Sequence, residues 1–407
     1  METSKQTSKN SSTLGVIESI RSTLRNNIRQ YGMLIALAVI MLYFQISTEG
    51  VLLKPMNVTS LVTQNSYVMV LAIGMTLCIL TGGNIDLSVG SLVAFIGAIS
   101  GVLIINNHMN PALAIVICLL VGAVVGIWQG FWIAFVRIPA FIVTLAGMLI
   151  FRGLTLSILK GQTLAPFPDS YGKINNGFIP DFFKGIGANL NITTLAAGAV
   201  VSVIYVILQY RKRLERAKYS LENIAFPLFV AQLVVVLAVI NIFAYWLSED
   251  QGIPIILVII GVLILGYSFF TTKTVQGRYL YAMGGNEKAA KLSGINTNKV
   301  LFFAYVNMAV LSAVTGIVSS STINSASPLA GGNFELDAIA ACFIGGASAY
   351  GGVGTVVGAI IGALVMGILN NGMSMMGVPT DRTQIVKGLV LLLAVAFDVF
   401  TKKKSRA

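Results

Sequence analysis

Charged residues are scarce in this chain. Asp, Glu, Lys and Arg make up only 10% of its 407 residues, whereas 56% are hydrophobic, and the mean hydropathy is +0.84. A soluble protein carries roughly a quarter charged residues. Histidine and cysteine are also rare: His108 is the single histidine, and Cys78, Cys118 and Cys342 all fall in apolar runs. These counts argue against histidine-based catalysis, a metal site and a disulfide framework.

The apolar residues come in runs long enough to cross a lipid bilayer. A helix of about 20 apolar residues spans the hydrocarbon core, and helical hydrogen bonds satisfy the backbone where lipid offers no partner. We therefore predict an all-α polytopic membrane protein with about 10–12 transmembrane helices. The candidate spans are 31–48, 62–80, 88–106, 112–136, 139–159, 190–209, 223–246, 253–270, 300–322, 334–350, 353–372 and 383–401.

The basic residues predict the orientation of these spans. Residues 1–30 form a polar, basic segment with no cleavage site after the first apolar run, so we expect an uncleaved first span. With the N-terminus in the cytoplasm, about 20 of the 27 Lys and Arg fall on the cytoplasmic side, including a basic tail at 402–407. The net charge of +12 then reflects topology in the bilayer and requires no nucleic acid.

A six-residue motif occurs twice, as Gly82–Leu87 (GGNIDL) and Gly331–Leu336 (GGNFEL). Each copy follows one apolar run and opens another. The runs before the two copies are the second and the ninth spans, an odd number apart, so the repeats would lie in opposite orientations. We predict inverted four-helix repeats at about 62–159 and 300–401 inside a single transmembrane domain, an arrangement typical of transporters.

Glycines recur at every fourth position in both repeats. They are Gly122, Gly126 and Gly130 in the first repeat, and Gly354, Gly358 and Gly362 in the second. Such a stripe gives a helix a flat face, which lets a neighbouring helix approach closely in lipid. We expect these glycines to pack helices together.

Two interpretations of the repeated motif remain open. In the first, Asn84 and Asn333 are helix N-caps, and Asp86 and Glu335 lie in the first helical turn beside the positive end of the helix dipole. In the second, these polar ends line the path of a polar solute. The residues assigned to such a path are Asn84, Asp86, Ser88, Arg152, Asn333, Glu335 and Asp337.

Arg152 has its own two interpretations, because an arginine inside an apolar span must face protein or water. It could pair with an ion or with backbone carbonyls, or it could belong to the solute path. Asn370 and Asn371, near the end of another span, are similarly open between a helix end and a site.

The loop at 273–299 is long enough to hold a short helix. Ala, Glu and Lys in 287–292 favour a helix, with Asn286 as its cap and Gly294 as its stop. On the cytoplasmic side, this helix is either an ordinary surface helix or a docking element for a partner protein.

Glu287–Gly294 (EKAAKLSG) resembles the coupling loop of ABC importer permeases, where the membrane subunit docks on its ATPase. The stretch Gly277–Phe397, the segment Ile79–Ser91 and the run Arg152–Thr155 resemble permeases of the ribose and xylose ABC importers. The resemblance covers nearly all of 60–400. The chain departs from the shorter ribose type at about 190–250, where two extra spans and a basic loop, Arg211–Lys218, are typical of xylose and multiple-monosaccharide permeases.

The resemblance implies a homodimeric permease in the bacterial plasma membrane, two cytoplasmic ATPase subunits and an extracytoplasmic sugar-binding protein. No G-x-x-x-x-G-K-[ST] sequence occurs in the chain, so ATP and Mg would be bound by the partner ATPase, and this chain would carry no cofactor and no enzymatic activity. The implied coupling residues are Gly284, Asn286, Glu287, Ala289, Ala290 and Gly294.

Alternative functions stay open at this point. The same machinery could carry another small polar solute, such as a nucleoside, an autoinducer-type sugar or an amino acid. An ion-coupled secondary transporter would also have inverted repeats and buried acids, with Asp86 and Glu335 as proton carriers. That second class leaves the loop at 284–294 without a role.

Overall fold

The computed structural model describes residues 28–183, 190–219 and 225–406. Within these residues the fold is helical, and pairing between extended segments is limited to isolated bridges such as the one between Leu164 and Ala326. Most of the predicted N-terminal segment, residues 1–27, lies outside the described residues. Contacts divide the chain into two compact units, a larger one with residues 33–53, 60–178 and 254–407, and a smaller one built mainly from 179–253.

The helices follow the predicted spans closely. In chain order they are α2 (Ile28–Ser47), α3 (Pro55–Gln64), α4 (Ser66–Leu80), α5 (Val89–Gly101) with the π-helix η1 (Val102–Asn106), α6 (Pro111–Ala134), α7 (Ala140–Leu159), α8 (Asp169–Asn176), α9 (Ile192–Lys218), α10 (Phe226–Glu249), α11 (Ile255–Lys273), α12 (Val275–Gly285), α13 (Glu287–Leu292), α14 (Thr297–Ile323), α15 (Phe334–Ile344), α16 (Val356–Met375) and α17 (Thr380–Arg406).

Eight helices within the described residues are long and apolar enough to cross a membrane, or nine if α3 and α4, bent by 43°, count as one span. The prediction of a full span at 334–350 is wrong. Helix α15 has only 11 residues, or about 16 Å of helix, because the glycine-rich stretch that follows leaves the helical conformation. Where we expected a separate tail at 402–407, helix α17 continues as far as Arg406.

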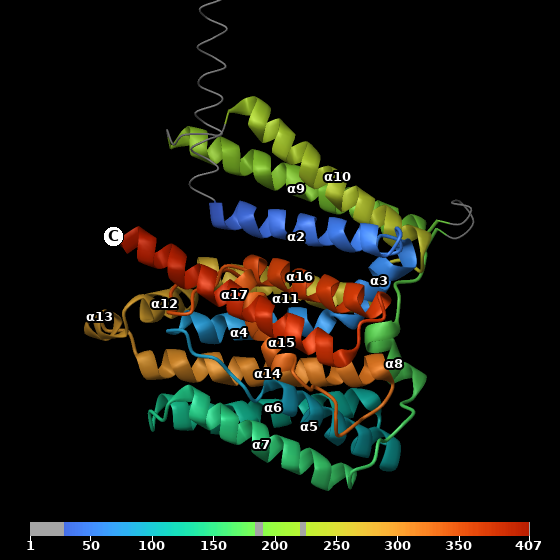
Figure 1. Cartoon of the computed structure of the whole chain (residues 1–407), viewed down its shortest axis with the longest axis vertical. Helices are drawn as coiled ribbons and strands as arrows, with labels where there is room; N and C mark the ends of the chain where they lie inside the picture. The colour runs from blue at the N-terminus through green and yellow to red at the C-terminus, as the bar shows by residue number, and fades with distance from the viewer. Residues whose placement is uncertain (1–27, 184–189, 220–224, 407) are drawn as a thin grey trace, which may run out of the picture. The chain divides into compact units, whose positions relative to one another are not determined.

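The packing of the larger unit has a two-fold correspondence. Helix α4 packs against α14, α15 and α16, while α14 packs against α4, α5 and α6 (Figure 1). Likewise α5 packs against α7, and α15 packs against α17. These contacts correspond element by element if α4–α7 match α14–α17, as the duplicated motif predicts. The opposite orientation of the two repeats in a membrane stays a prediction.

The glycine stripes allow the closest helix contacts. A Cβ on Gly126 of α6 would lie 2.7 Å from the Cα of Val306 in α14, and a Cβ on Gly362 of α16 would lie 1.9 Å from the carbonyl oxygen of Ala341 in α15. The expectation of close packing is therefore confirmed for both stripes, with one exception. Gly354 lies in the loop before α16, with φ at +150°, so it is not part of the helical stripe.

The smaller unit is a pair of antiparallel helices, α9 and α10, at the position of the two predicted extra spans. Gly198 faces Ala244 at a separation that leaves no room for a side chain, and the Asn241 amide donates to the Ser202 hydroxyl at 2.9 Å. The predicted basic loop Arg211–Lys218 is instead the last two turns of α9. Arg, Lys, Leu and Glu are good helix formers, and basic residues suit the negative end of the helix dipole.

We expect Gly126→Leu to destabilise the permease core, because the new side chain would push α6 away from α14. Overpacking of this kind costs about 1–3 kcal/mol. Gly266→Leu in α11 is the matched control, since nothing in the described residues lies within 4 Å of a Cβ there. Thermal denaturation of the purified protein in detergent, followed by size-exclusion chromatography, should show a lower melting midpoint for Gly126→Leu alone. Equal midpoints would contradict the packing role.

Candidate functional site

The two copies of the repeated motif include non-helical segments that connect consecutive helices. Helix α4 ends at Leu80, residues 81–88 are non-helical, and α5 begins at Val89. In the second repeat α14 ends at Ile323, residues 324–333 are non-helical, and α15 begins at Phe334. The first segment leads into α5 and η1, and the second leads into the 11-residue α15.

The two half-helices meet at a pair of glycines. A Cβ on Gly90 would lie 2.2 Å from the carbonyl oxygen of Gly331, and a Cβ on Gly331 would lie 2.0 Å from the carbonyl oxygen of Gly90. Gly331 also has φ at +67°, which side chains disfavour. The N-termini of α5 and α15 therefore approach each other backbone to backbone, and both positive helix ends face the same region.

Asp86 organises the start of α5. Its Oδ1 accepts hydrogen bonds from the Ser88 backbone N at 2.8 Å and from the Ser88 hydroxyl at 2.6 Å, and the carboxylate is only 1% exposed. The Gln129 amide of α6 donates to the same hydroxyl at 2.7 Å. The prediction that Asn84 caps this helix is wrong, because the N-cap position is Ser88, where no side chain makes a capping hydrogen bond within the described residues. Asp86 lies before the first turn of α5, where its bonds to Ser88 form a local turn.

Gln129 was not among the predicted site residues. It is fully buried, and within the described residues its Oε1 has no hydrogen-bond partner. The signal that could have identified it is its polarity inside an otherwise apolar span, because an intramembrane polar side chain faces protein or a solute path.

Arg152 of α7 holds the second interruption in place. Its Nη1 donates to the carbonyl oxygens of Pro328 and Ala330, each at 2.9 Å. A comparable contact occurs at the first interruption, where the Tyr305 hydroxyl donates to the carbonyl of Ile85 at 3.2 Å. The interpretation that Arg152 pairs with backbone carbonyls agrees with these two contacts. A role in the solute path stays a prediction.

The acids of the second motif lie in the first turn of α15, as expected. Asn333 stands at the N-cap position with φ at +64°, but within the described residues its side chain makes no capping hydrogen bond. The Glu335 carboxylate packs against Gly90, with Oε2 2.3 Å from the position of a Cβ there. Glu335 therefore joins the junction of the two half-helices.

Asp337 belongs to a different cluster, although it follows Glu335 by only two residues in the same first turn of α15. The Lys387 ammonium of α17 lies 3.0 Å from its Oδ1 and 3.1 Å from its Oδ2, and the Tyr67 hydroxyl of α4 donates to Oδ2 at 2.7 Å. The Asp337 side chain is 2% exposed and that of Lys387 is 21% exposed. The predicted site residues are thus divided between the half-helix junction and this ion pair.

The predicted short helix in the 273–299 loop is confirmed as α13. The Asn286 side chain accepts from the Ala289 backbone N at 3.0 Å, and Gly294 ends the turn with φ at +85°. The preceding helix, α12, was not predicted. Ala290 is the buried residue of α13, and Leu292 at its end is 90% exposed.

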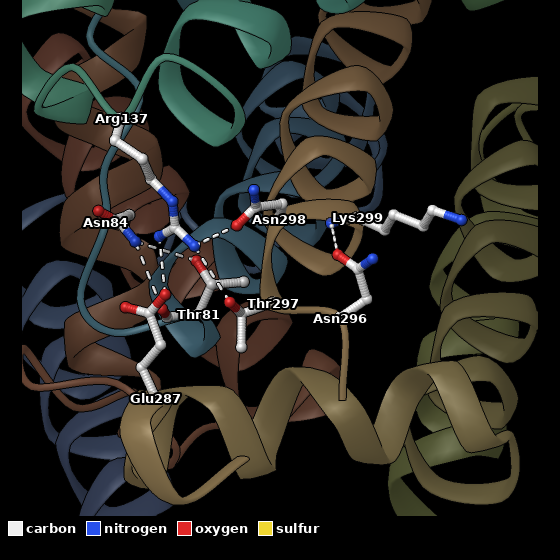
Figure 2. Close-up of polar contacts among 8 residues, drawn as sticks. All are labelled: Thr81, Asn84, Arg137, Glu287, Asn296, Thr297, Asn298 and Lys299. Atoms are coloured by element: carbon white, nitrogen blue, oxygen red, sulfur yellow. Dashed lines mark hydrogen bonds and ion pairs between the residues drawn. The ribbon is translucent and has the colours of Figure 1, made fainter. Parts of the chain in front are cut away.

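Helix α13 is tied to the transmembrane helices by Arg137, which follows α6. The guanidinium lies 2.7 Å from the Glu287 carboxylate and donates to the Thr297 hydroxyl at 3.1 Å and to Asn298 (Figure 2). Asn84 points toward the same cluster in Figure 2 and donates to the Thr81 hydroxyl at 3.2 Å. Within the described residues, the hydrogen bonds of the Asn84 amide therefore go to Thr81 at the end of α4 and not to Asp86.

Gly284 makes a second connection between α12 and the core. A Cβ on Gly284 would lie 1.8 Å from the carbonyl oxygen of Leu80, the last residue of α4. The same carbonyl accepts from the Gly352 backbone N at 3.1 Å, in the loop between α15 and α16. The Leu80 carbonyl at the end of α4 is thus in contact with both the α12–α13 segment and the loop after α15.

Comparison with known proteins assigns this architecture. Residues 57–395 match the family described as "Branched-chain amino acid transport system / permease component". The chain belongs to this permease family. As a member, it is a multi-pass membrane permease with a role in transport, not in catalysis.

The permease is similar to two groups of sugar permeases along most of its length. It is 39% identical to the xylose transport system permease protein of Escherichia coli (strain K12) over 380 residues, which cover 93% of this chain and 94% of that protein. The corresponding protein of Haemophilus influenzae is 40% identical, with 93% and 98% covered. The ribose import permease protein of Escherichia coli (strain K12) is 34% identical, with 84% and 85% covered. No solved structure matches the permease.

We expect Arg152→Ala to destabilise the permease, because it leaves the Pro328 and Ala330 carbonyls without their donor. An unsatisfied buried polar group costs about 1–3 kcal/mol. Arg152→Lys should recover part of the loss, since the ammonium retains donors. Arg278→Ala, which changes an exposed arginine of α12, is the control. The measurement is the melting midpoint in detergent. An unchanged midpoint in Arg152→Ala, with transport abolished, would instead favour a direct role in the solute path.

Proposed function

We propose that this permease is the transmembrane subunit of an ATP-driven importer for a monosaccharide, with xylose as the first cargo to test. The similarity to xylose permeases over 93% of the chain carries this proposal. It is supported by the two extra helices α9 and α10, which were the sequence feature that distinguished the xylose type from the shorter ribose type. The chain has no Walker A sequence, so ATP and Mg would be bound by a partner ATPase.

The proposed assembly contains two copies of the permease, a cytoplasmic ABC ATPase and an extracytoplasmic sugar-binding protein, in a bacterial plasma membrane with both termini in the cytoplasm. The ATPase would dock on the α12–α13 segment. The resemblance of Glu287–Gly294 to the coupling loop of ABC importer permeases supports this docking site. The proposed coupling residues are Gly284, Asn286, Glu287, Ala289, Ala290 and Gly294.

Movement of α13 would reach both interrupted crossings. Arg137 connects α13 to the start of α14, which packs against α4, α5 and α6. Gly284 connects the same segment to the end of α4 and to the loop after α15. A packed, hydrogen-bonded element of this kind transmits displacement as a unit. In this proposal ATP-driven closure of the ATPase shifts α4 and α14 together and so alters the half-helix junction.

The proposed solute path follows the half-helices, with Asp86, Ser88, Arg152, Asn333, Glu335 and Asp337 along it. Asn84 lies beside the α13 cluster, so it would act at the cytoplasmic end of the path. A second candidate cargo is a branched-chain amino acid, which is favoured by the printed description of the family. The uptake experiment below includes it.

The deciding experiment is uptake into proteoliposomes that contain the permease, a candidate ATPase and a candidate binding protein. We expect labelled D-xylose to accumulate only when all three proteins and ATP are present. Accumulation of L-leucine in place of xylose would assign the other cargo. Uptake by the permease alone under an ion gradient would overturn the ABC proposal and make the buried acids Asp86 and Glu335 candidates for ion coupling.

Neighbouring glycines provide a matched test of the coupling segment. Gly284→Ala would place a methyl group against the Leu80 carbonyl, whereas Gly285→Ala meets nothing within 4 Å among the described residues. We expect Gly284→Ala to lower ATP-dependent uptake at least tenfold while the protein still elutes as a folded species, and Gly285→Ala to behave as wild type. Equal uptake by both variants would contradict a coupling role for this contact.

A further inference from the structure

Two cavities lie along the first turns of α17. The larger, about 350 Å³, is lined mostly by amide and hydroxyl side chains of α4, α16 and α17 and their flanks; we call it the amide cavity. The smaller, about 230 Å³, lies deeper along α16 and α17. Lys387 lines both cavities, and Asp337 lines the smaller one. The residues of the amide cavity used below are Gln64, Asn65, Tyr67, Asn370, Ser374 and Thr383.

The Asp337–Lys387 ion pair borders both cavities through Lys387. Tyr67 reinforces it with its hydrogen bond to Asp337 and stacks on Phe334 with ring centroids 3.8 Å apart. Lys387 is the charged residue in the lining of the amide cavity, and its ammonium is paired with Asp337. A neutral ligand is therefore favoured over an anion or a cation, each of which would have to compete with one member of a buried pair.

The remaining lining matches a polyhydroxylated ligand. Amides and hydroxyls both donate and accept hydrogen bonds, as sugar hydroxyls do. Asn370 lines the amide cavity and offers its side-chain amide as a hydrogen-bonding anchor. Its Nδ2 lies 3.4 Å from the Tyr67 hydroxyl, a long contact that leaves donor capacity. A volume near 350 Å³ is at the small end of ligand sites, which suits one sugar ring and not an oligosaccharide.

We propose that the amide cavity is a binding site for a neutral monosaccharide on the permease itself, with Lys387, paired with Asp337, in its lining and Asn370 as a hydrogen-bonding anchor. This inference rests on the proposed sugar transport. It adds Tyr67, Asn370 and Lys387 to the solute path. It also places a site on the permease, so that selection need not reside only in a separate binding protein.

Ligand protection of introduced cysteines tests the site directly. The native Cys78, Cys118 and Cys342 are fully buried, so background labelling should be low. Ser374→Cys and Thr383→Cys would place thiols in the amide cavity, and Ser170→Cys, an exposed α8 position that lines neither cavity, is the control. The probe is a membrane-impermeant maleimide, applied to the purified full-length permease with increasing D-xylose or L-leucine.

We expect saturating D-xylose to slow labelling at least fivefold in Ser374→Cys and Thr383→Cys, to leave Ser170→Cys unchanged, and L-leucine to have no effect. Adding Asn370→Ala to either cysteine variant should raise the xylose concentration for half-protection about tenfold. The site would be overturned if xylose left the labelling rate unchanged in cysteine variants that still import xylose in the three-component assay. The proposed function would then stay intact. Protection by L-leucine alone would overturn the assignment of a sugar ligand.

Protection by xylose without three-component import supports the site and separates it from the proposed ATP-driven mechanism. If xylose does not protect the cysteine variants and the wild-type three-component assembly does not import xylose, both the site and the sugar assignment are overturned. Folding of each variant is checked by size-exclusion chromatography, and Asn370→Ala is compared with its own cysteine parent, so a general loss of structure would appear in both elution and control labelling.

Discussion

The structure depends on satisfying backbone groups where two helices are interrupted inside the bundle. Residues 81–88 and 324–333 are non-helical, and lipid offers their backbones no partner. Arg152 donates to two carbonyls of the second segment, Tyr305 donates to one carbonyl of the first, and Asp86 accepts the Ser88 backbone N. An arginine inside an apolar span is costly by itself, but here it replaces the water that these carbonyls would otherwise need.

Glycine makes this arrangement possible. The half-helices α5 and α15 meet through Gly90 and Gly331, and no side chain could be placed between their backbones. The same close packing recurs between α6 and α14, between α15 and α16, and between Gly284 and the end of α4. Small residues at these contacts bring helices near enough for dispersion and weak polar contacts to hold them together in lipid, where the hydrophobic effect does not favour one helix neighbour over another.

The polar groups form three separate clusters with different chemistry. The junction of α5 and α15 holds Asp86 and Glu335, the α13 cluster centres on Arg137, and the ion pair of Asp337 with Lys387 lies beside the amide cavity. The first cluster is buried and largely self-satisfied, the second is half-exposed and suited to a partner, and the third borders space for a ligand. In the proposed importer these clusters would serve as hinge, docking element and sugar site.

The sequence by itself predicted the helical class, the duplicated plan, the glycine contacts and helix α13 with its Asn286 cap and Gly294 stop. These features are local, because they follow from apolar run length, glycine spacing and capping residues within a few positions of each other. The sequence failed where apolar composition continued beyond a helix end: the run at 334–350 reads as a span, but α15 ends at Ile344. The basic run Arg211–Lys218 was likewise assigned to a loop although its residues are good helix formers.

Only the tertiary structure decided which polar residues meet. Gln129 reaches Ser88, Arg137 reaches Glu287, and Lys387 reaches Asp337 across 41, 150 and 50 residues of sequence. The tertiary structure also shows that Asn84 hydrogen-bonds to Thr81 and that Asn370 lines a cavity. Such pairings depend on how the helices pack against one another. Hydrophobic periodicity predicts a helix, but it does not predict which neighbouring helix its polar side chains will contact.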